Sequence, residues 1–346
     1  MKKHLPVTAI VSTKNRYFTS LPNLLIGILL QNTKPEELII YDDGEHRDLR
    51  KEPVYENIFP MLQQSGISWR VEFGTGIGQV ANHQRSIEDS KCDWIWRLDD
   101  DNVPEPDCLE KLFGNVADDV GAVGGLVLDP KFNYQSLNPL ASNKIEDIYL
   151  GLNMQWYKWS GKTEVDHLYS TFIFRKEAAK QIDGYCRELS MVGHREETIF
   201  SYSLKRAGWK LIVDPSAVTW HMRNSQGGIR SGSRMEMWQH DEEIFKNKLY
   251  EWGIVPRNIK LCVLDSGLGD HLIFSKILPD MKKKYSDIVI AACYPQVFED
   301  DKDVTLISIA DAQQMCDLEG HNVYKFMWDR TWTRSLEDAY REVFSV

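Results

Sequence analysis

The sequence predicts an α/β protein with a mixed, mostly parallel sheet, followed by a smaller α/β module. Short β-branched runs alternate with stretches of helical spacing, an order that packs helices on the faces of such a sheet. A length of 346 residues is enough for about two domains. A fresh strand, glycine turn and helix begin near residue 258. We therefore expect one domain at residues 1–257 and a second at 258–346.

Apolar and β-branched runs give the strands of the first half. They are Val7–Ser12, Leu38–Asp42, Val71–Gly74, Trp94–Asp99 and Ala122–Leu128. Helical spacing occurs at Leu21–Gln31, Gly78–Ser90 and Pro106–Val116, where the proline suits a first helical turn. Because ligands of such sheets bind at the carboxyl ends of the strands, unusual residues there are candidates for a site.

The pattern is poorer from Tyr134 to Lys162, where we expect irregular structure. Beyond it we expect a strand, a helix, two strands and a helix, at Ser170–Phe174, Glu197–Ala207, Lys210–Val213, Ala217–His221 and Arg234–Trp252. A linker at Gly253–Asn258 precedes the second domain. That domain is expected to contain a strand at Leu261–Leu264, a glycine turn at Gly267–Gly269, a helix to about Lys284 and a strand at Ile288–Cys293.

Charge and hydropathy exclude several classes of protein. The chain has 41 Lys and Arg against 51 Asp and Glu, a formal net charge of −10, which disfavours nonspecific binding to nucleic acid or anionic membranes. The longest apolar stretch, residues 21–30, is broken by Pro22, Asn23 and Gly27 and is shorter than the ~20 residues that span a bilayer. No signal-peptide core follows Met1, so we expect a cytoplasmic protein without a transmembrane segment.

The cysteines point to the same compartment. None of the six belongs to a C-x-x-C pair, which argues against a metal cluster or disulfide framework. We expect reduced, mostly buried thiols at Cys92, Cys108, Cys186, Cys262, Cys293 and Cys316.

Acidic residues gather at two predicted strand ends. Asp99, Asp100 and Asp101 follow an apolar strand, and three adjacent carboxylates are favoured where a hard cation such as Mg²⁺ or Mn²⁺ neutralises them. A solvated acidic turn before Pro104 is the alternative. Asp43 follows the second strand, where a carboxylate can bind a base or ribose, although a plain strand-to-turn Asp-Gly pattern explains it equally well.

The order of these motifs resembles a known family. Ser12–Arg16, the Asp42-Asp43-Gly44 turn, a glycine-rich entry to the helix bearing Arg85, Leu98–Asp101 and the later His194–Thr198 segment together resemble family 2 glycosyltransferases, which have the GT-A fold. The resemblance covers about residues 5–240. It implies metal-dependent transfer of a sugar from a nucleoside-diphosphate sugar, with a UDP-sugar favoured, to an acceptor hydroxyl. It also implies inversion at the anomeric carbon, although the Trp220-His221 segment resembles retaining enzymes of the same fold.

The resemblance also implies roles for individual residues. Donor binding is expected from Thr13, Asn15, Arg16, Asp43, Arg85, Asp99, Asp100, Arg230 and Arg234. Asp101, Asp99 and His221 are the expected ligands of Mn²⁺ or Mg²⁺. Glu197 stands at the position of the family's catalytic Asp, with Glu196 beside it. Because the family pattern is Glu-Asp, the Glu-Glu pair leaves open which residue is the base, and both can instead be first-turn charges favoured by the helix dipole.

A basic stretch follows the last strand of the first domain. No acid occurs from Pro215 to Met235, and the stretch contains His221, Arg223, Arg230, Arg234 and the pair Gly227-Gly228. A glycine-hinged basic loop suits gripping a diphosphate. The same loop would also suit an acceptor that carries phosphate, including nucleic acid. His221 is either the third metal ligand or a structural residue.

The C-terminal segment resembles the first β-α-β unit of family 9 heptosyltransferases. The resemblance rests on Leu261–His271, with its Gly267-Leu-Gly269-Asp270 turn. Residues 258–346 are too few for the two halves of such an enzyme, so we expect an accessory module for acceptor positioning, oligomerisation or stability. Alternatively, the glycines simply form a tight turn that Asp270 caps.

Other functions stay open at this stage. A nucleotidyltransferase would share the nucleotide and metal chemistry, but it needs a glycine-rich loop after the first strand, and Ser12–Arg16 contains no glycine. A non-catalytic nucleotide-sugar-binding module would not need the acids. The acceptor is a saccharide, a small molecule, a protein or a hydroxymethylated base in DNA, and the net charge counts against DNA.

Overall fold

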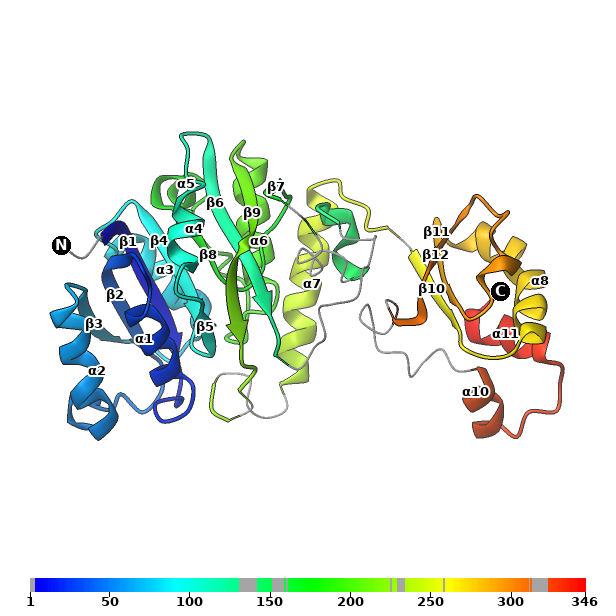
Figure 1. Cartoon of the computed structure of the whole chain (residues 1–346), viewed down its shortest axis with the longest axis horizontal. Helices are drawn as coiled ribbons and strands as arrows, with labels where there is room; N and C mark the ends of the chain where they lie inside the picture. Colours follow the sequence, from blue (N-terminus) through cyan, green and yellow to red (C-terminus); the bar gives the residue numbers. More distant parts are fainter. Residues whose placement is uncertain are drawn as a thin grey trace. The chain divides into compact units, whose positions relative to one another are not determined.

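The computed structural model describes residues 4–130, 142–150, 159, 161–224, 226–228, 234–257, 259–310, 312 and 323–346. The described residues form two compact units (Figure 1). The first takes its residues from Met1–Phe132, Asn143–Ile145 and Trp159–Ile254, and the second from Asn133–Ser142, Glu146–Lys158 and Val255–Val346. The predicted irregular region, Arg230 and Cys316 lie largely or wholly outside the described residues.

A mixed sheet forms the centre of the first unit. Its strands are β1 (His4–Thr13), β2 (Lys34–Asp42), β3 (Ser68–Phe73), β4 (Trp94–Asp99), β5 (Asn102–Pro104), β6 (Val120–Leu128), β7 (Thr163–Glu164), β8 (Phe172–Arg175) and β9 (Lys210–His221). The order is β3-β2-β1-β4-β8-β6-β9-β5, with β7 also paired to β9. Strands β3, β2, β1 and β4 are mutually parallel, as are β6 and β9, whereas β8 runs antiparallel between β4 and β6. This is the mixed, largely parallel α/β sheet that the sequence predicts.

Helices cover both faces of this sheet. They are α1 (Leu21–Leu29), α2 (Pro53–Gln64), α3 (Gln79–Asp89), α4 (Cys108–Phe113), α5 (Lys176–Gln181), α6 (Glu196–Arg206) and α7 (Met235–Glu251), with short 3₁₀ turns at Leu49–Lys51 and Ile145–Leu150. Apolar residues of α1, α2 and α4 belong to the same core cluster as Ile173 of β8. On the same strand Phe174 packs on Phe200 of α6, with ring centroids 5.0 Å apart. Because neighbouring strand residues point to opposite faces, α6 covers the other side.

The first-unit strands of the sequence prediction are present, with one difference. Lys210–Val213 and Ala217–His221, predicted as two strands, form the single strand β9. Its register against β6 shifts near Gly124, and the Asp214 side chain accepts the backbone N–H of Ser216 at 3.0 Å. A local irregularity therefore replaces the predicted break.

Parallel pairing brings three strand ends together. In the register, Ser12 of β1 pairs with Tyr41 of β2 on one side and with Asp99 of β4 on the other. The residues that follow these strands therefore emerge at one edge of the sheet. His221, the last residue of β9, joins them through the Asn102 pairing of β5.

The second unit is built on a three-stranded parallel sheet in the order β10-β11-β12, formed by Ile259–Leu264, Asp287–Ala292 and Val304–Ile307. Its described helices are α8 (Leu268–Lys284), α10 (Val323–Asp329) and α11 (Leu336–Phe344), with a 3₁₀ turn at Pro295–Val297. In the glycine turn, the ring nitrogens of fully buried His271 face the Gly267 carbonyl oxygen at 2.9 Å and the Tyr294 N–H at 3.3 Å. His271 thus ties the turn to the following loop.

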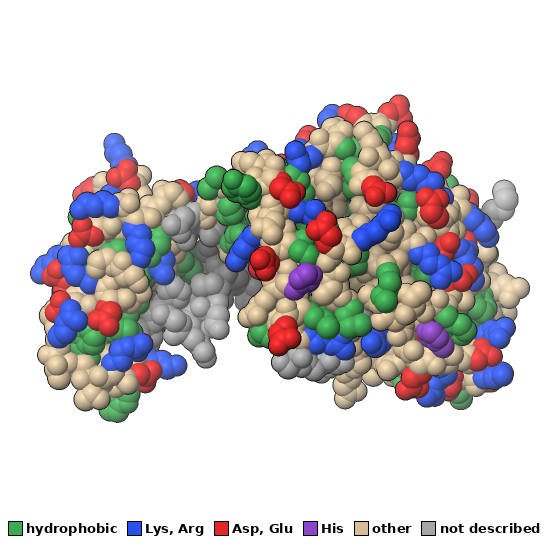
Figure 2. Space-filling view, turned by 180° about the vertical axis from the view of Figure 1, so that it is seen from behind, with side chains coloured by type: hydrophobic (Ala, Val, Ile, Leu, Met, Phe, Trp, Pro, Cys, Tyr) green, Lys and Arg blue, Asp and Glu red, His purple; other side chains and the backbone are tan. Residues whose placement is uncertain are grey.

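Surface charge is mixed on the face that Figure 2 presents. Lys and Arg side chains alternate with Asp and Glu side chains over both units, and neither sign covers a continuous area of this face. The net charge of −10 is therefore not concentrated there. In the described part of the chain, no helix combines the length and apolarity needed to cross a membrane. Cys92, Cys108, Cys186, Cys262 and Cys293 are free thiols.

Candidate active site

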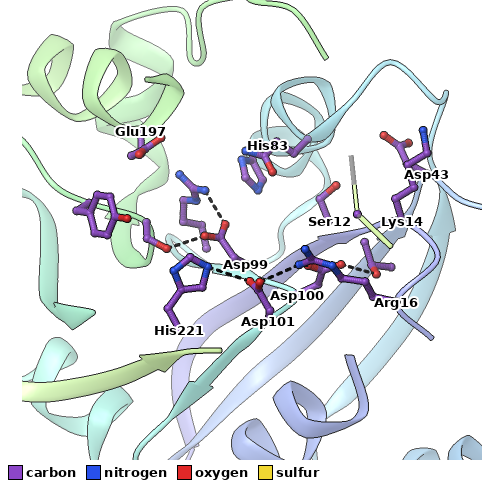
Figure 3. A pocket seen from close by; sticks show the side chains of 16 residues that line it. Ser12, Lys14, Arg16, Asp43, His83, Asp99, Asp100, Asp101, Glu197 and His221 are labelled. Carbon is purple, nitrogen blue, oxygen red and sulfur yellow. Dashed lines mark hydrogen bonds and ion pairs between the residues drawn. The ribbon is translucent and has the colours of Figure 1, made fainter. Parts of the chain in front are cut away.

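An open pocket of about 800 Å³ lies where the ends of β1, β2, β4 and β9 meet (Figure 3). Its lining is strongly polar. It consists of Ser12, Thr13, Lys14, Arg16, Asp43, Gln79, His83, Arg97, Asp99, Asp100, Asp101, Tyr169, Ser170, Glu197, His221 and Gly228. Figure 3 shows the three adjacent aspartates between Glu197 on one side and Asp43 with Lys14 on the other.

The middle aspartate is held by the loop after β1. Asp100 accepts the hydroxyl of Thr13 at 2.8 Å and pairs with Arg16 Nη1 at 2.6 Å. Burial raises the pKa of Asp100 to about 6, although the charge of Arg16 acts in the opposite direction. Thr13 and Arg16, predicted as donor-binding residues, therefore line the pocket while anchoring Asp100.

Asp99 and Asp101 face other partners. Asp99 accepts Arg97 Nη2 at 2.9 Å and the hydroxyl of Ser170 at 2.6 Å. Asp101 pairs through Oδ2 with Arg16 at 3.0 Å and through Oδ1 with His221 Nε2 at 3.2 Å. Burial acts to lower the pKa of His221, but the hydrogen bond and charge of Asp101 outweigh it and raise that pKa.

The pair Asp101 and His221 fits a shared divalent cation. The oxygen Asp101 Oδ1 and the nitrogen His221 Nε2 lie 3.2 Å apart, so one cation could contact both. Within the described ranges, no group of three or more His, Cys, Asp or Glu side chains is arranged to hold a metal ion. A cation here would therefore need other oxygens to complete its shell, as Mg²⁺-type sites do with substrate phosphates.

The two adjacent glutamates have different surroundings. Glu196 is fully buried, and its Oε1 lies 2.8 Å from Arg97 Nη2, 3.2 Å from Gln79 Nε2 and 3.4 Å from His83 Nδ1. Burial acts to raise the pKa of Glu196, but the charge of Arg97 lowers it below its ordinary value. Glu197 is half-buried and lines the pocket.

At the other end of the pocket, Asp43 organises the loop before α3. Its two carboxylate oxygens accept the backbone N–H groups of Gly76 at 3.1 Å and Gly78 at 3.0 Å. Asn15 has a positive φ of 55° and accepts the N–H of Glu45 at 3.1 Å, so it shapes the neighbouring turn. Asp43 lines the pocket, whereas Asn15 is not part of the described lining.

Three cations to which the sequence pointed are not among the described residues that line the pocket. Arg85 pairs with Glu72 at 2.8 Å and Asp89 at 2.9 Å and does not contribute to the described lining. Arg234 Nη1 contacts Met191 Sδ at 2.6 Å. Arg223, from the same basic stretch, pairs with Asp129 at 2.7 Å. Within the described residues, the stretch therefore contributes His221 and Gly228 to the pocket lining.

Sequence reasoning missed several residues of the lining. The most important is Arg97, whose side chain is 1% exposed and bridges Asp99 and Glu196. A charged residue inside the otherwise apolar strand Trp94–Leu98 was its signal, because a buried cation requires buried partners. His83 and Gln79 carried no comparable signal, since both are ordinary in a helix.

Residues 8–182 match the sequence model of the family described as Glycosyl transferase family 2. No curated protein matches the chain. Among solved structures, S. aureus TarS 1–349 in complex with UDP-GlcNAc has a TM-score of 0.52 and 13% identity, over 71% of this chain and 67% of that chain. At this identity the likeness concerns the fold.

Two further structures have lower TM-scores. The mannosyltransferase PcManGT from Pyrobaculum calidifontis, in complex with GDP-Man and Mn²⁺, has a TM-score of 0.45 and 16% identity over 64% of this chain and 58% of its own. GalNAc-T7 with UDP, GalNAc and Mn²⁺ has a TM-score of 0.47 and 13% identity over 72% of this chain and 59% of its own. The chain thus spans less than two thirds of the length of either protein.

Proposed function

This chain belongs to glycosyl transferase family 2 and is a glycosyltransferase, and we propose that it transfers a sugar from a nucleoside-diphosphate sugar to an acceptor hydroxyl with inversion. A UDP-sugar is the first donor class to test. The carrying observation is that Glu197 lines the same pocket as Asp99, Asp101 and His221, whereas its neighbour Glu196 is buried against Arg97.

The arrangement of these residues suggests how the donor would lie in the pocket. Asp43 and Lys14 lie on one side of the aspartates and Glu197 on the other (Figure 3). The base and ribose would occupy the Asp43 side, and the sugar the Glu197 side. Glu197 takes the proton of the acceptor hydroxyl while the oxygen of that hydroxyl bonds to the anomeric carbon. The bond to the diphosphate breaks, and its electron pair leaves with the nucleoside diphosphate.

Charge in the pocket supports dependence on a divalent cation. Five carboxylates line it, against three permanently cationic side chains and two histidines. An anionic diphosphate entering such a pocket meets net repulsion unless further positive charge accompanies it. Asp101 and His221 would hold the cation, with Asp99 beside them. When bound, the cation would neutralise the charge that develops on the leaving diphosphate.

The test separates binding from chemistry. UDP-, GDP-, ADP- and CMP-sugars are compared for thermal stabilisation and for hydrolysis with Mn²⁺ and with EDTA. We expect one donor class to stabilise the protein and EDTA to abolish the effect. Asp101→Asn should weaken the Mn²⁺ response. Glu197→Gln should keep donor binding and lose at least about 100-fold in turnover.

The matched control for the base is Glu196→Gln. It should lower stability and leave the donor response of the remaining folded protein in place. Wild-type turnover in Glu197→Gln would overturn its role as the base. Absence of stabilisation by every donor, with or without Mn²⁺, would overturn the proposed function.

A further inference from the structure

A second hollow lies beside the loop that leads to Glu197. It is an open groove of about 820 Å³ lined by His194, Trp238, Gln239, Glu242, Glu243 and Lys246. All except His194 come from α7, and none has a role in the mechanism above. Trp238 is half-buried, and its ring lies 4.4 Å from that of His194.

One short loop separates this groove from the donor pocket. His194 lines the groove, and Glu197, three residues later, lines the pocket, so their Cα atoms are at most about 11 Å apart. On its pocket side the loop packs so closely that a Cβ on Gly78 would lie 2.5 Å from the carbonyl oxygen of Met191. The loop therefore touches the wall of the pocket.

On its other side the loop is fixed to α7. Fully buried Asp241 accepts the N–H of Ser190 at 2.6 Å, the Ser190 hydroxyl at 2.9 Å and the N–H of His194 at 2.8 Å. Glu242 binds His194 Nε2 at 3.0 Å and Arg195 Nε at 3.2 Å. These charge-assisted bonds give the groove a rigid position relative to Glu197.

We propose that the acceptor is a neutral oligosaccharide and that this groove binds it beside the acceptor unit whose hydroxyl Glu197 deprotonates. The proposal rests on the proposed function. An indole ring offers a large, rigid, apolar surface to the C–H face of a pyranose. The exposed amide of Gln239 and carboxylate of Glu243 supply both donors and acceptors for hydroxyl groups. This pairing of an aromatic face with a few polar groups is typical of ligand sites that orient their substrate.

The charges of the groove give polyanions no electrostatic advantage. Glu242 and Glu243 face it with one lysine, Lys246, and Glu242 is already paired with the loop. The remaining carboxylate, Glu243, is balanced by Lys246, so the lining offers no net positive charge to attract the phosphate groups of DNA or the carboxylates of a polyuronate. The groove therefore favours an uncharged glycan over a nucleic-acid acceptor.

The test uses the full chain on an array of neutral and anionic oligosaccharides, with single-stranded DNA as a further arm. Wild type should bind at least one neutral oligosaccharide, and Trp238→Ala should weaken that binding at least about tenfold, equivalent to 1.4 kcal/mol. Trp328→Ala, which removes an 86% exposed tryptophan of the second unit, is the matched control and should bind like wild type. Gln239→Ala and Glu243→Ala, both at exposed positions, repeat the test if Trp238→Ala does not fold.

A measurement of donor binding distinguishes a failure of this proposal from a failure of the proposed function. Trp238→Ala should keep the wild-type thermal response to the donor sugar. The acceptor groove would be overturned if none of the groove variants changed the binding of neutral glycans. It would also be overturned if the wild type bound only DNA or anionic glycans, or bound no glycan at all. Absence of any donor response in wild type would instead overturn the proposed function.

Discussion

Removal of the buried guanidinium of Arg97 should destabilise the first unit severely. Arg97 Nη2 lies 2.8 Å from Glu196 Oε1 and 2.9 Å from Asp99 Oδ1, and the Glu196 side chain has no exposed area. Arg97→Met leaves that carboxylate buried beside His83 and Gln79 without a full cationic partner. Breaking one side of a buried pair costs about 3–5 kcal/mol, so we expect the free energy of unfolding to fall by that amount.

The measurement is a thermal and urea unfolding series. For a unit of this size, about 2–4 °C per kcal/mol predicts a fall in melting temperature of roughly 10 °C. The control is Arg85→Met, because Arg85 is 42% exposed and its surface pairs should be worth about 1 kcal/mol or less. Adding Glu196→Leu to Arg97→Met should recover most of the loss, since an apolar pair can replace a buried ionic one.

The loss of unfolding free energy in Arg97→Met should become smaller at low pH. Arg97 lowers the pKa of Glu196 against the effect of burial, so the pair stabilises the folded state above the ordinary pKa of a glutamate, about 4.3. That stability is lost as pH falls through the folded-state pKa. The gap between wild type and Arg97→Met should therefore be full at pH 7 and narrow below about pH 4. A loss under about 1 kcal/mol at pH 7 would refute the buried-pair reasoning.

Three further outcomes are expected. Gly78→Ala should cost about 1–3 kcal/mol, because φ is +103° and a Cβ would lie 2.5 Å from Met191 O, whereas Gly161→Ala meets no atom within 4 Å and should leave the melting temperature unchanged. Burial lowers the pKa of His167 to about 4 in the folded state, against about 6.5 in the unfolded state. Between about pH 4 and pH 6.5, unfolding is therefore accompanied by uptake of a proton. The free energy of unfolding should fall by up to about 3 kcal/mol as the pH is lowered through this range. In His167→Gln, the urea midpoints at pH 7 and pH 5 should differ less than they do in the wild type. Asp241→Asn should lower stability by about 2 kcal/mol in urea, because the amide cannot accept all three bonds from Ser190 and His194.

The fold was predictable where apolar runs are short and uninterrupted. The strand pattern of the first half is present because β1, β2 and β4 are buried on both faces. Helix α2 was missed although Tyr55, Ile58, Phe59 and Leu62 have helical spacing and are buried. Pro60 lies inside that helix, where proline removes a hydrogen bond, so the local signal argued against a helix that tertiary packing stabilises.

The location of the site was predictable, but its internal contacts were not. Parallel strands end at one edge, so acids after β2 and β4 had to meet there. The partner of each acid depends on residues far apart in the sequence, such as Arg16 and Asp100 at a separation of 84 positions. The acid-free stretch was expected to supply the cations of the pocket. Among the described cations of the lining, Arg16 was expected there, whereas Lys14 and Arg97 were not, and Arg223 of the acid-free stretch pairs with Asp129.

The geometry of the α6 N-terminus explains how two identical neighbours acquire different environments. Consecutive residues of a helix point about 100° apart, so when the first turn places Glu196 against the sheet, Glu197 turns toward the pocket. The sheet contact is the guanidinium of Arg97, which also holds Asp99. One buried cation therefore links the end of β4 to the start of α6 and limits how far Glu197 can move from the aspartates. Since a misplacement of about 1 Å can cost about 100-fold in rate, we propose that buried Glu196 serves half-buried Glu197 by fixing its position.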